Sequence, residues 1–97
     1  MAFVQVIQFK TSKIDEVQKV GDAWEAAAGS DRQARRRVLC EDRDNPGQYF
    51  NIVFFDSYES AMENSNLPET QAAAAQYMEL SDGQPVFYDL DVIEDRS

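Results

Sequence analysis

The alternation of hydrophobic and polar residues predicts four β-strands in this chain. Segments rich in β-branched and aromatic residues, whose side chains point alternately to two faces, are typical of strands. Four such segments occur, at residues 2–9, 34–42, 48–55 and 85–93. Pro46 and Gly47 lie between the second and third segments and suit the two central positions of a type II turn, so these strands are expected to form a hairpin.

A first helix is predicted between the first two strands. Apolar or small residues recur there every three or four positions, which places them on one side of a helix. These residues are Ile14, Val17, Gly21, Trp24 and Ala28. Ser12 is the expected N-cap, with Asp15 three places on as an approximate capping box, and Gly29 is expected to end the helix.

A second helical region is predicted between the third and fourth strands. Asp56, with Glu59 three residues later, suggests its start. The run Asn66-Leu67-Pro68 interrupts it, because proline removes a backbone donor and clashes with the preceding turn, and the helix resumes over residues 69–80. The order β-α-β-β-α-β predicts an α+β fold with all of residues 1–97 in one domain.

Alternation also predicts which strand residues face the helices. Two wholly apolar sets, Phe50 to Phe54 and Val86 to Val92 taken in steps of two, are expected under the helices. Because their side chains are large, Phe3, Ile7 and Phe9 are also expected on this face, and Gln5 lies on it with them because it alternates in step with them. On the second strand, Val38 and Cys40 are expected there, and Arg36 lies on the same face as these two residues. The opposite face then carries Val4, Val6, Tyr49, Val53, Phe55 and Phe87. A second face this apolar is expected to be covered by another molecule.

The composition and charge of the chain exclude several kinds of site and partner. The chain has no histidine, which removes histidine-ligated haem, the usual zinc sites and nucleophiles activated by imidazole. Its formal net charge of −9 makes nucleic acid and anionic membranes poor partners. No apolar run approaches the roughly 20 residues that span a bilayer. The start of the chain lacks a secretory signal, so a cytoplasmic location is expected, and the single Cys40 is expected to be a buried structural thiol.

Two motifs suggest functions that other features argue against. Residues 48–55 are similar to the aromatic strand of an RNA-recognition motif, but the leading basic residue and the glycine pattern are missing. Residues 42–47 faintly resemble a calcium loop, but Pro46 stands where a ligand is expected and Val53 where the bidentate glutamate belongs. A hairpin turn explains the second motif better.

The element order, the broken second helical region and the segment SAMENSNLPET at residues 60–70 together resemble the antibiotic biosynthesis monooxygenase family of the dimeric α/β-barrel superfamily. The resemblance implies a ferredoxin-like protomer with a four-stranded antiparallel sheet, which dimerises face to face into an α/β barrel. Such a homodimer would cover the second apolar face. The family contains cofactor-independent oxygenases of polycyclic phenols, haem-degrading enzymes, isomerases and proteins of no known activity.

The chain departs from the haem-degrading branch of that family. This branch uses a histidine and a nearby tryptophan on the second helical region, whereas residues 72–77 here read AAAAQY and Trp24 lies on the first helix. The branch's strand-one asparagine has no identical match, Gln5 being the nearest polar candidate. Neither a cofactor nor a metal is therefore expected.

A ligand pocket is predicted between helices and sheet, where the small alanines of the second helical region leave room. Gln5, Arg36 and Tyr88 are expected to point into it, with Trp24 and Tyr77 closing it. Arg36 and Gln5 would donate hydrogen bonds to a substrate anion, and Tyr77 or Tyr88 would orient the substrate or move a proton. The alternative is that the three aromatic residues fill the core, with their polar atoms at its rim.

Two charged pairs on the strands suggest contacts between subunits. Arg35 and Arg37 share one face of the second strand, and Asp89 and Asp91 share one face of the fourth. In the barrel dimer of the family these strands approach each other, so intersubunit ion pairs are one expectation and four solvated charges the other.

Two functions remain open on the sequence. One is a cofactor-independent monooxygenase acting on an aromatic or polyketide-like molecule. The other is a non-catalytic ligand-binding or accessory dimer on the same scaffold.

Overall fold

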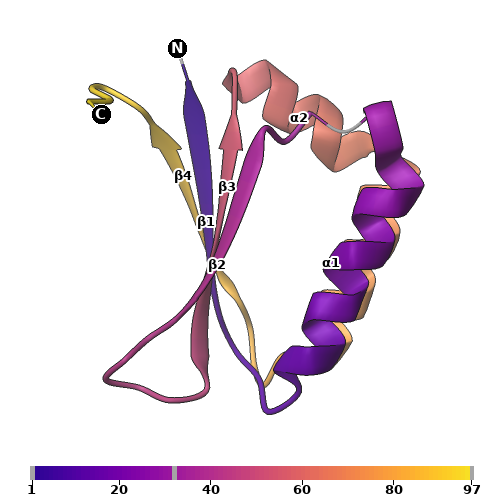
Figure 1. Ribbon diagram of the computed structural model, residues 1–97, viewed down its shortest axis with the longest axis vertical. Coiled ribbons are helices and arrows are strands. Elements are labelled where there is room, and N and C mark those ends of the chain that lie inside the picture. The colour runs from indigo at the N-terminus through magenta and orange to yellow at the C-terminus, as the bar shows by residue number, and fades with distance from the viewer. Residues whose placement is uncertain (1, 32, 97) are drawn as a thin grey trace.

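The computed structural model describes residues 2–31 and 33–96, and its strands form one antiparallel sheet. The elements follow the order β1 (Phe3–Lys10), α1 (Ile14–Ala28), the short 3-10 helix η1 (Gly29–Asp31), β2 (Arg36–Glu41), β3 (Gln48–Phe55), α2 (Tyr58–Asn66), α3 (Pro68–Leu80) and β4 (Val86–Asp91). The strand order across the sheet is β2-β3-β1-β4. Figure 1 shows the helices of the described residues all on one side of the sheet. The predicted ferredoxin-like α+β fold is confirmed.

The first helix ends as predicted but begins differently. Val17, Gly21, Trp24 and Ala28 are buried, and Gly29 closes α1 with a φ of 53°. The predicted Ser12 cap is wrong: Lys13 occupies the N-cap without a side-chain bond. The neighbouring Thr11 organises this corner instead. Its hydroxyl accepts from the Lys13 N–H at 2.9 Å and donates to the Leu80 carbonyl at 2.7 Å, which ties the start of α1 to the end of α3.

The second helical region is broken where the sequence predicts. Leu67 adopts an extended conformation between α2 and α3, and Pro68 takes the first position of α3, where its missing N–H has no partner to lose. The start of α2 lies one residue beyond the predicted one. Ser57 is the N-cap, and its hydroxyl accepts from the Ser60 N–H at 3.0 Å.

The hairpin between β2 and β3 confirms the predicted turn. The Gln48 N–H donates to the Asn45 carbonyl at 3.0 Å, so Pro46 and Gly47 hold the central positions, and Gly47 has the φ of 91° that glycine adopts without strain. Asp42 braces this turn by accepting hydrogen bonds from the Asn45 side chain and the Asp44 N–H, which together lower the pKa of its carboxyl below the ordinary value.

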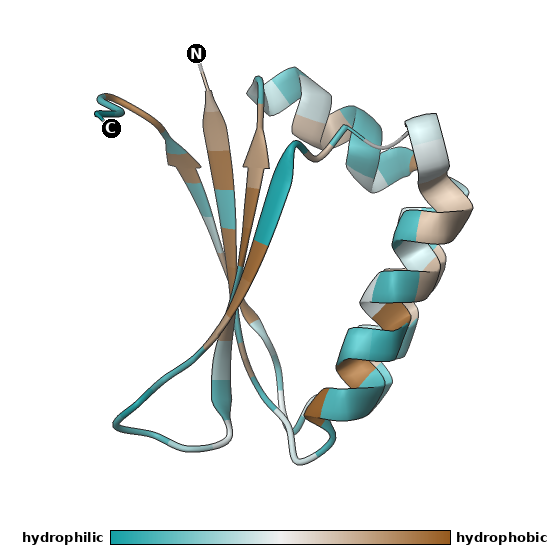
Figure 2. Cartoon of the chain, in the orientation of Figure 1, coloured by the Kyte–Doolittle hydropathy of each residue, from teal (hydrophilic) through white to brown (hydrophobic). Residues whose placement is uncertain are grey.

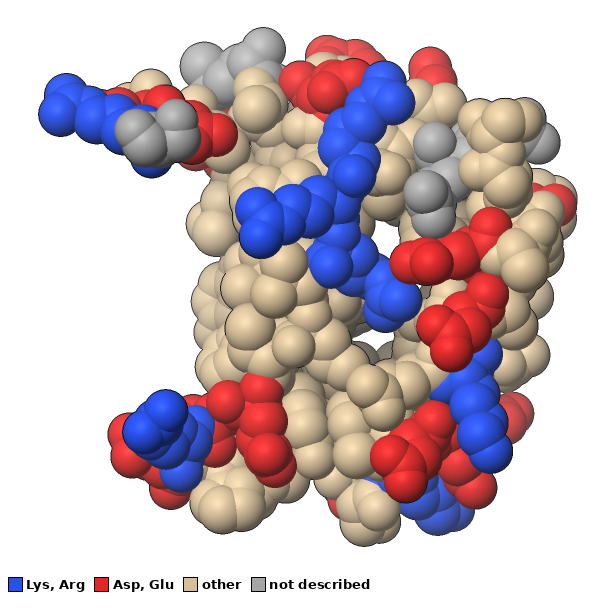
Figure 3. Space-filling model, in the orientation of Figure 1, with Lys and Arg blue, Asp and Glu red and all other residues tan. Residues whose placement is uncertain are grey.

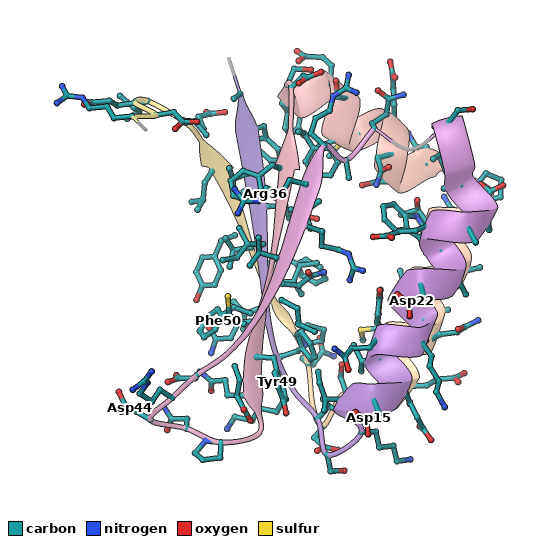
Figure 4. All side chains as sticks on the ribbon, in the orientation of Figure 1. Asp15, Asp22, Arg36, Asp44, Tyr49 and Phe50 are labelled. Atoms are coloured by element: carbon teal, nitrogen blue, oxygen red, sulfur yellow. The ribbon has the colours of Figure 1, made fainter. Side chains whose placement is uncertain are left out.

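The predicted faces are right for β1 and reversed for the other three strands. Phe3, Gln5, Ile7 and Phe9 do face the helices, and their cross-strand partners on β3 are Phe55, Val53, Asn51 and Tyr49. The residues predicted under the helices, Phe50, Ile52 and Phe54, therefore lie on the opposite face, as do Tyr88 on β4 and Arg36 on β2. Figure 4 shows this alternation, with Tyr49 on the side of α1 and Phe50 on the far side.

The predicted second apolar face exists, but most of its residues differ from those expected. Val4 and Val6 were correctly placed on it. The others are Val38, Phe50, Ile52, Phe54, Val86, Tyr88 and Leu90. On β4, Tyr88 and Leu90 are 44% and 47% exposed. Figure 2 shows how far hydrophobic residues extend along the strands, whereas hydrophobic and hydrophilic residues alternate along α1.

The same reversal corrects the prediction for Cys40. The thiol was expected in the core, but Cys40 shares the parity of Arg36 and Val38 and is exposed on the helix-free side. The core of the protomer lies instead at the end of the sheet where β1 begins and β3 ends. It consists of Phe3, Trp24, Ala28, Ala34, Val53, Phe55, Ala61 and Ala73.

Candidate functional site

Two adjoining cavities of about 230 and 110 Å³ lie between the sheet and the helices. They share the lining residues Ile7, Arg37, Asn51, Ala74, Tyr77 and Phe87. Figure 3 shows the molecule hollowed between these layers, with basic side chains on the sheet side of the opening and acidic ones on α1. Phe87 lines both cavities yet is 58% exposed, so it marks a place where they open to solvent.

Small residues on the second helical region create this space, as predicted. Ala73 and Ala74 of α3 line the larger cavity opposite β1 and β3. Most of the walls are apolar. The smaller cavity is enclosed by Ile7, Phe9, Val17, Leu39, Ala74, Met78, Pro85 and Phe87, and its polar lining residues are Arg37, Asn51, Tyr77 and Ser81. Such a lining suits a mainly apolar ligand with one polar edge.

Three of the five predicted site residues meet at the larger cavity. Gln5, Trp24 and Tyr77 all line it. The Gln5 amide donates to Asp89 at 3.4 Å. The Trp24 indole N–H donates to the Thr70 hydroxyl at 2.8 Å, so the ring offers the cavity an apolar wall rather than this donor.

The other two predicted residues point away. The guanidinium of Arg36 lies over the Phe54 ring, 5.5 Å from its centroid, and the Tyr88 hydroxyl donates to Gln8 at 3.3 Å. Both belong to the helix-free face, because a shift of one residue in a strand exchanges the two faces. Their predicted placement in the pocket is therefore wrong.

Arg37 takes the place predicted for Arg36. Its side chain is 20% exposed and extends from β2 toward α1, where Nη2 lies 3.3 Å from Glu25 Oε1. Gly21 makes room for it: a Cβ at that position would lie 2.8 Å from both terminal guanidinium nitrogens. Arg35 likewise pairs within the chain, at 2.7 Å from Asp56. Both arginines thus have partners other than the intersubunit aspartates expected from the sequence.

Two further polar residues at the cavities escaped the sequence analysis. Asn51 lies on the helix-facing side of β3 and lines both cavities. Asn64, buried on α2, lines the larger one and accepts from the Gln33 N–H at 3.1 Å. Asn51 could have been identified from the sequence, because asparagine is a poor strand former and its presence inside an otherwise apolar strand suggests a functional role.

Burial changes the chemistry available to Tyr77. It raises the pKa of the phenol above its ordinary value, with Glu25 and Asp22 adding to the rise and Arg37 opposing it. Tyr77 therefore stays protonated at neutral pH and can donate a hydrogen bond, but it is a poor base. Among residues 2–31 and 33–96, no group of three or more acidic, cysteine or histidine side chains could hold a metal ion.

None of the helices in the described part of the chain is long and apolar enough to cross a membrane. Sequence comparison matches the chain to no protein-family model and to no curated protein. Comparison of structures, in contrast, finds many similar folds.

A candidate antibiotic biosynthesis monooxygenase from Caulobacter crescentus superposes with a TM-score of 0.81 at 21% identity, over 96% of this chain and 91% of the other. SnoaB, a cofactor-independent oxygenase from Streptomyces nogalater, gives 0.81 at 16% identity over 97% and 95% of the two chains. Rv0793 from Mycobacterium tuberculosis gives 0.80 at 17% identity over the whole of both. The chain therefore has the ferredoxin-like fold of the antibiotic biosynthesis monooxygenase proteins, as the resemblance in its sequence implied.

Proposed function

We propose that the protein is a cofactor-independent oxygenase of an aromatic or polyketide-like molecule. The observation that carries the proposal is the cavity between sheet and helices, which combines apolar walls with the inward-pointing Arg37. Similarity in fold to a cofactor-independent oxygenase supports the same activity. Because proteins with the same fold can have many different activities, the proposal depends mainly on the residues of the cavity.

Cofactor-free oxygenation needs an electron-rich substrate anion held near dioxygen. The Arg37 guanidinium and the Gln5 amide would stabilise that anion, and Tyr77 would donate a hydrogen bond to it. Trp24 would form a flat wall against an aromatic substrate. Charge stabilisation of this kind would be strongest once a bound substrate has displaced water from the cavity.

A non-catalytic ligand-binding or accessory protein is the second candidate. Two observations favour it: the described residues that line the two cavities include no carboxylate, and Tyr77 is a poor base. An oxygenase built this way must receive a substrate acidic enough to ionise when the cationic Arg37 is beside it.

We propose further that the working unit is a homodimer formed through the helix-free face of the sheet. The apolar residues of that face are left uncovered by the chain's own helices. A twin copy would bury them and restore a hydrophobic layer on both sides of the sheet.

Oxygen uptake in the presence of a panel of naphthalene hydroquinones, corrected for autoxidation, tests the oxygenase. We expect Arg37→Lys to lower kcat/KM at least about tenfold, because lysine lacks the guanidinium fork, whereas Arg36→Lys keeps the rate. Trp24→Phe is expected to reduce the rate as well. No uptake by the unmodified protein across the panel, together with ligand-induced NMR shifts of cavity residues, would instead support the binding protein.

A further inference from the structure

Two buried polar atoms of the cavity lining have no hydrogen-bond partner within the described chain. They are Nε of Arg37, a donor, and Oδ1 of Asn51, an acceptor. Their residues line both cavities. Buried polar groups in folded proteins are nearly always paired, so an unpaired donor and an unpaired acceptor on two residues that line the same cavities call for a partner from outside the chain.

The register of the sheet explains why these two residues are neighbours. Arg37 lies opposite Val53, and Leu39 opposite Asn51, so Arg37 and Asn51 are diagonal neighbours on the helix-facing side of β2 and β3. Diagonal residues on adjacent antiparallel strands are roughly 7–8 Å apart, within reach of one ligand edge.

We propose that Arg37 and Asn51 form a recognition pair for a ligand that carries an acceptor oxygen beside a donor group. Arg37 Nε–H donates to the ligand oxygen, and Asn51 Oδ1 accepts from the adjacent O–H or N–H of the ligand. Enol ketones and lactams present such an edge. The inference rests on the proposed function only in placing the ligand in this cavity.

The surroundings of Arg37 favour this edge over a carboxylate or a phosphate. Its Nη2 is engaged with Glu25 at 3.3 Å, so part of the cationic charge is compensated and the bidentate fork that grips a carboxylate is in use. Apolar side chains, including Ile7, Ala74 and Phe87, surround the pair on the rest of the lining. The ligand is therefore mainly apolar, with a neutral or singly charged polar edge.

NMR titration with two model lactams tests the pair on the unmodified protein. Carbostyril presents a carbonyl beside an N–H, and N-methylcarbostyril keeps the carbonyl but blocks the donor. We expect carbostyril to bind about tenfold more tightly, the effect of one hydrogen bond to a buried acceptor, and to shift the amide signals of β2 and β3. Equal affinities, or no binding of either compound at millimolar concentration, would overturn the proposal.

Variants assign the discrimination to the two side chains. Asn51→Leu is expected to lower the affinity for carbostyril about tenfold and to leave the affinity for N-methylcarbostyril within about twofold. Arg37→Lys is expected to lower both affinities, since both lactams accept a hydrogen bond from Arg37 through the carbonyl. Arg43→Lys, an equivalent change on the exposed hairpin, is the matched control and should change neither affinity. Discrimination that persists in Asn51→Leu counts against the assignment.

The binding experiment separates this inference from the oxygenase. Donor-dependent lactam binding without oxygen uptake from any hydroquinone leaves the recognition pair standing and removes the oxygenase. Oxygen uptake by a protein that binds both lactams equally supports the oxygenase and overturns the pair.

Discussion

The position of Arg37 depends on the absence of a side chain on the facing helix. Gly21 lies on the buried stripe of α1, and a Cβ there would come within 2.8 Å of the guanidinium nitrogens. A glycine inside a helix destabilises it by roughly 0.5–1 kcal/mol relative to alanine. The chain thus carries a stability cost at a position that lets Arg37 reach the cavity.

Gly21→Ala is expected to stabilise the fold and to weaken ligand binding. The helix gains up to about 1 kcal/mol in propensity, and the guanidinium, the mobile end of a long side chain, moves away from α1. Urea unfolding measures the first effect and titration with carbostyril the second. Ala23→Gly, an exposed position on the same helix, is the converse control: it should lose about 1 kcal/mol and keep its affinity. Unchanged binding by Gly21→Ala would contradict this role of the glycine.

At the scale of elements, the corners between strands and helices depend on hydroxyl side chains. Thr11 links the start of α1 to the end of α3, and Ser57 caps α2. Both contacts hold helix ends in place. Sequence patterns locate such corners to within a residue, and the side chain that makes the bond depends on the local path of the backbone.

Ser57→Ala is expected to lower the free energy of unfolding by about 1 kcal/mol, the usual effect of removing a serine N-cap. Ser12→Ala, the same change at the residue that resembles a cap in the sequence but does not serve as one, should stay within about 0.5 kcal/mol of the unmodified protein. Urea unfolding of both variants checks the contrast. Equal decreases in the free energy of unfolding would mean that the Ser57 hydrogen bond does not stabilise the protein.

At the scale of the whole molecule, the sheet is apolar on both faces and the helices cover only one. The helix-free face carries Val4, Val6, Ile52, Phe54 and Leu90, among others. A monomer would leave this surface in water, whereas a face-to-face dimer would place each sheet between its own helices and a second sheet. Cys40 lies on the same face, so a dimer would also limit access to the thiol.

Ile52→Lys tests the dimer, because it places a charge on the middle strands of the helix-free face. Light scattering should give the unmodified protein twice the mass of the 11.0 kDa chain, and the variant a mass near that of one chain. Gln18→Lys, which adds the same charge on an exposed position of α1, should remain dimeric. A mass of one chain for the unmodified protein at micromolar concentration would exclude the proposed dimer.

The local order of elements was predictable because it depends on neighbours in sequence. β3 begins and ends at the predicted residues, Pro68 interrupts the second helical region, and Gly29 ends α1. Each of these features follows from the backbone chemistry of a few adjacent residues. Gln5 and Trp24 could be assigned to the cavity for the same reason, since the alternation of β1 and the helical stripe of α1 were interpreted correctly.

Which face of β2, β3 and β4 meets the helices could not be decided from their sequences. On β3, the set Phe50, Ile52 and Phe54 is more uniformly apolar than Asn51, Val53 and Phe55, yet the second set faces the helices. Alternation identifies the buried face of a strand only when the opposite face is polar. Here the more apolar face would contact a partner subunit rather than water. The sequence by itself therefore determined the elements, their order and the presence of two apolar faces. Only the tertiary structure decided the orientation of each face, and with it the choice of Arg37 over Arg36, because strand pairing and helix packing act on all four strands at once.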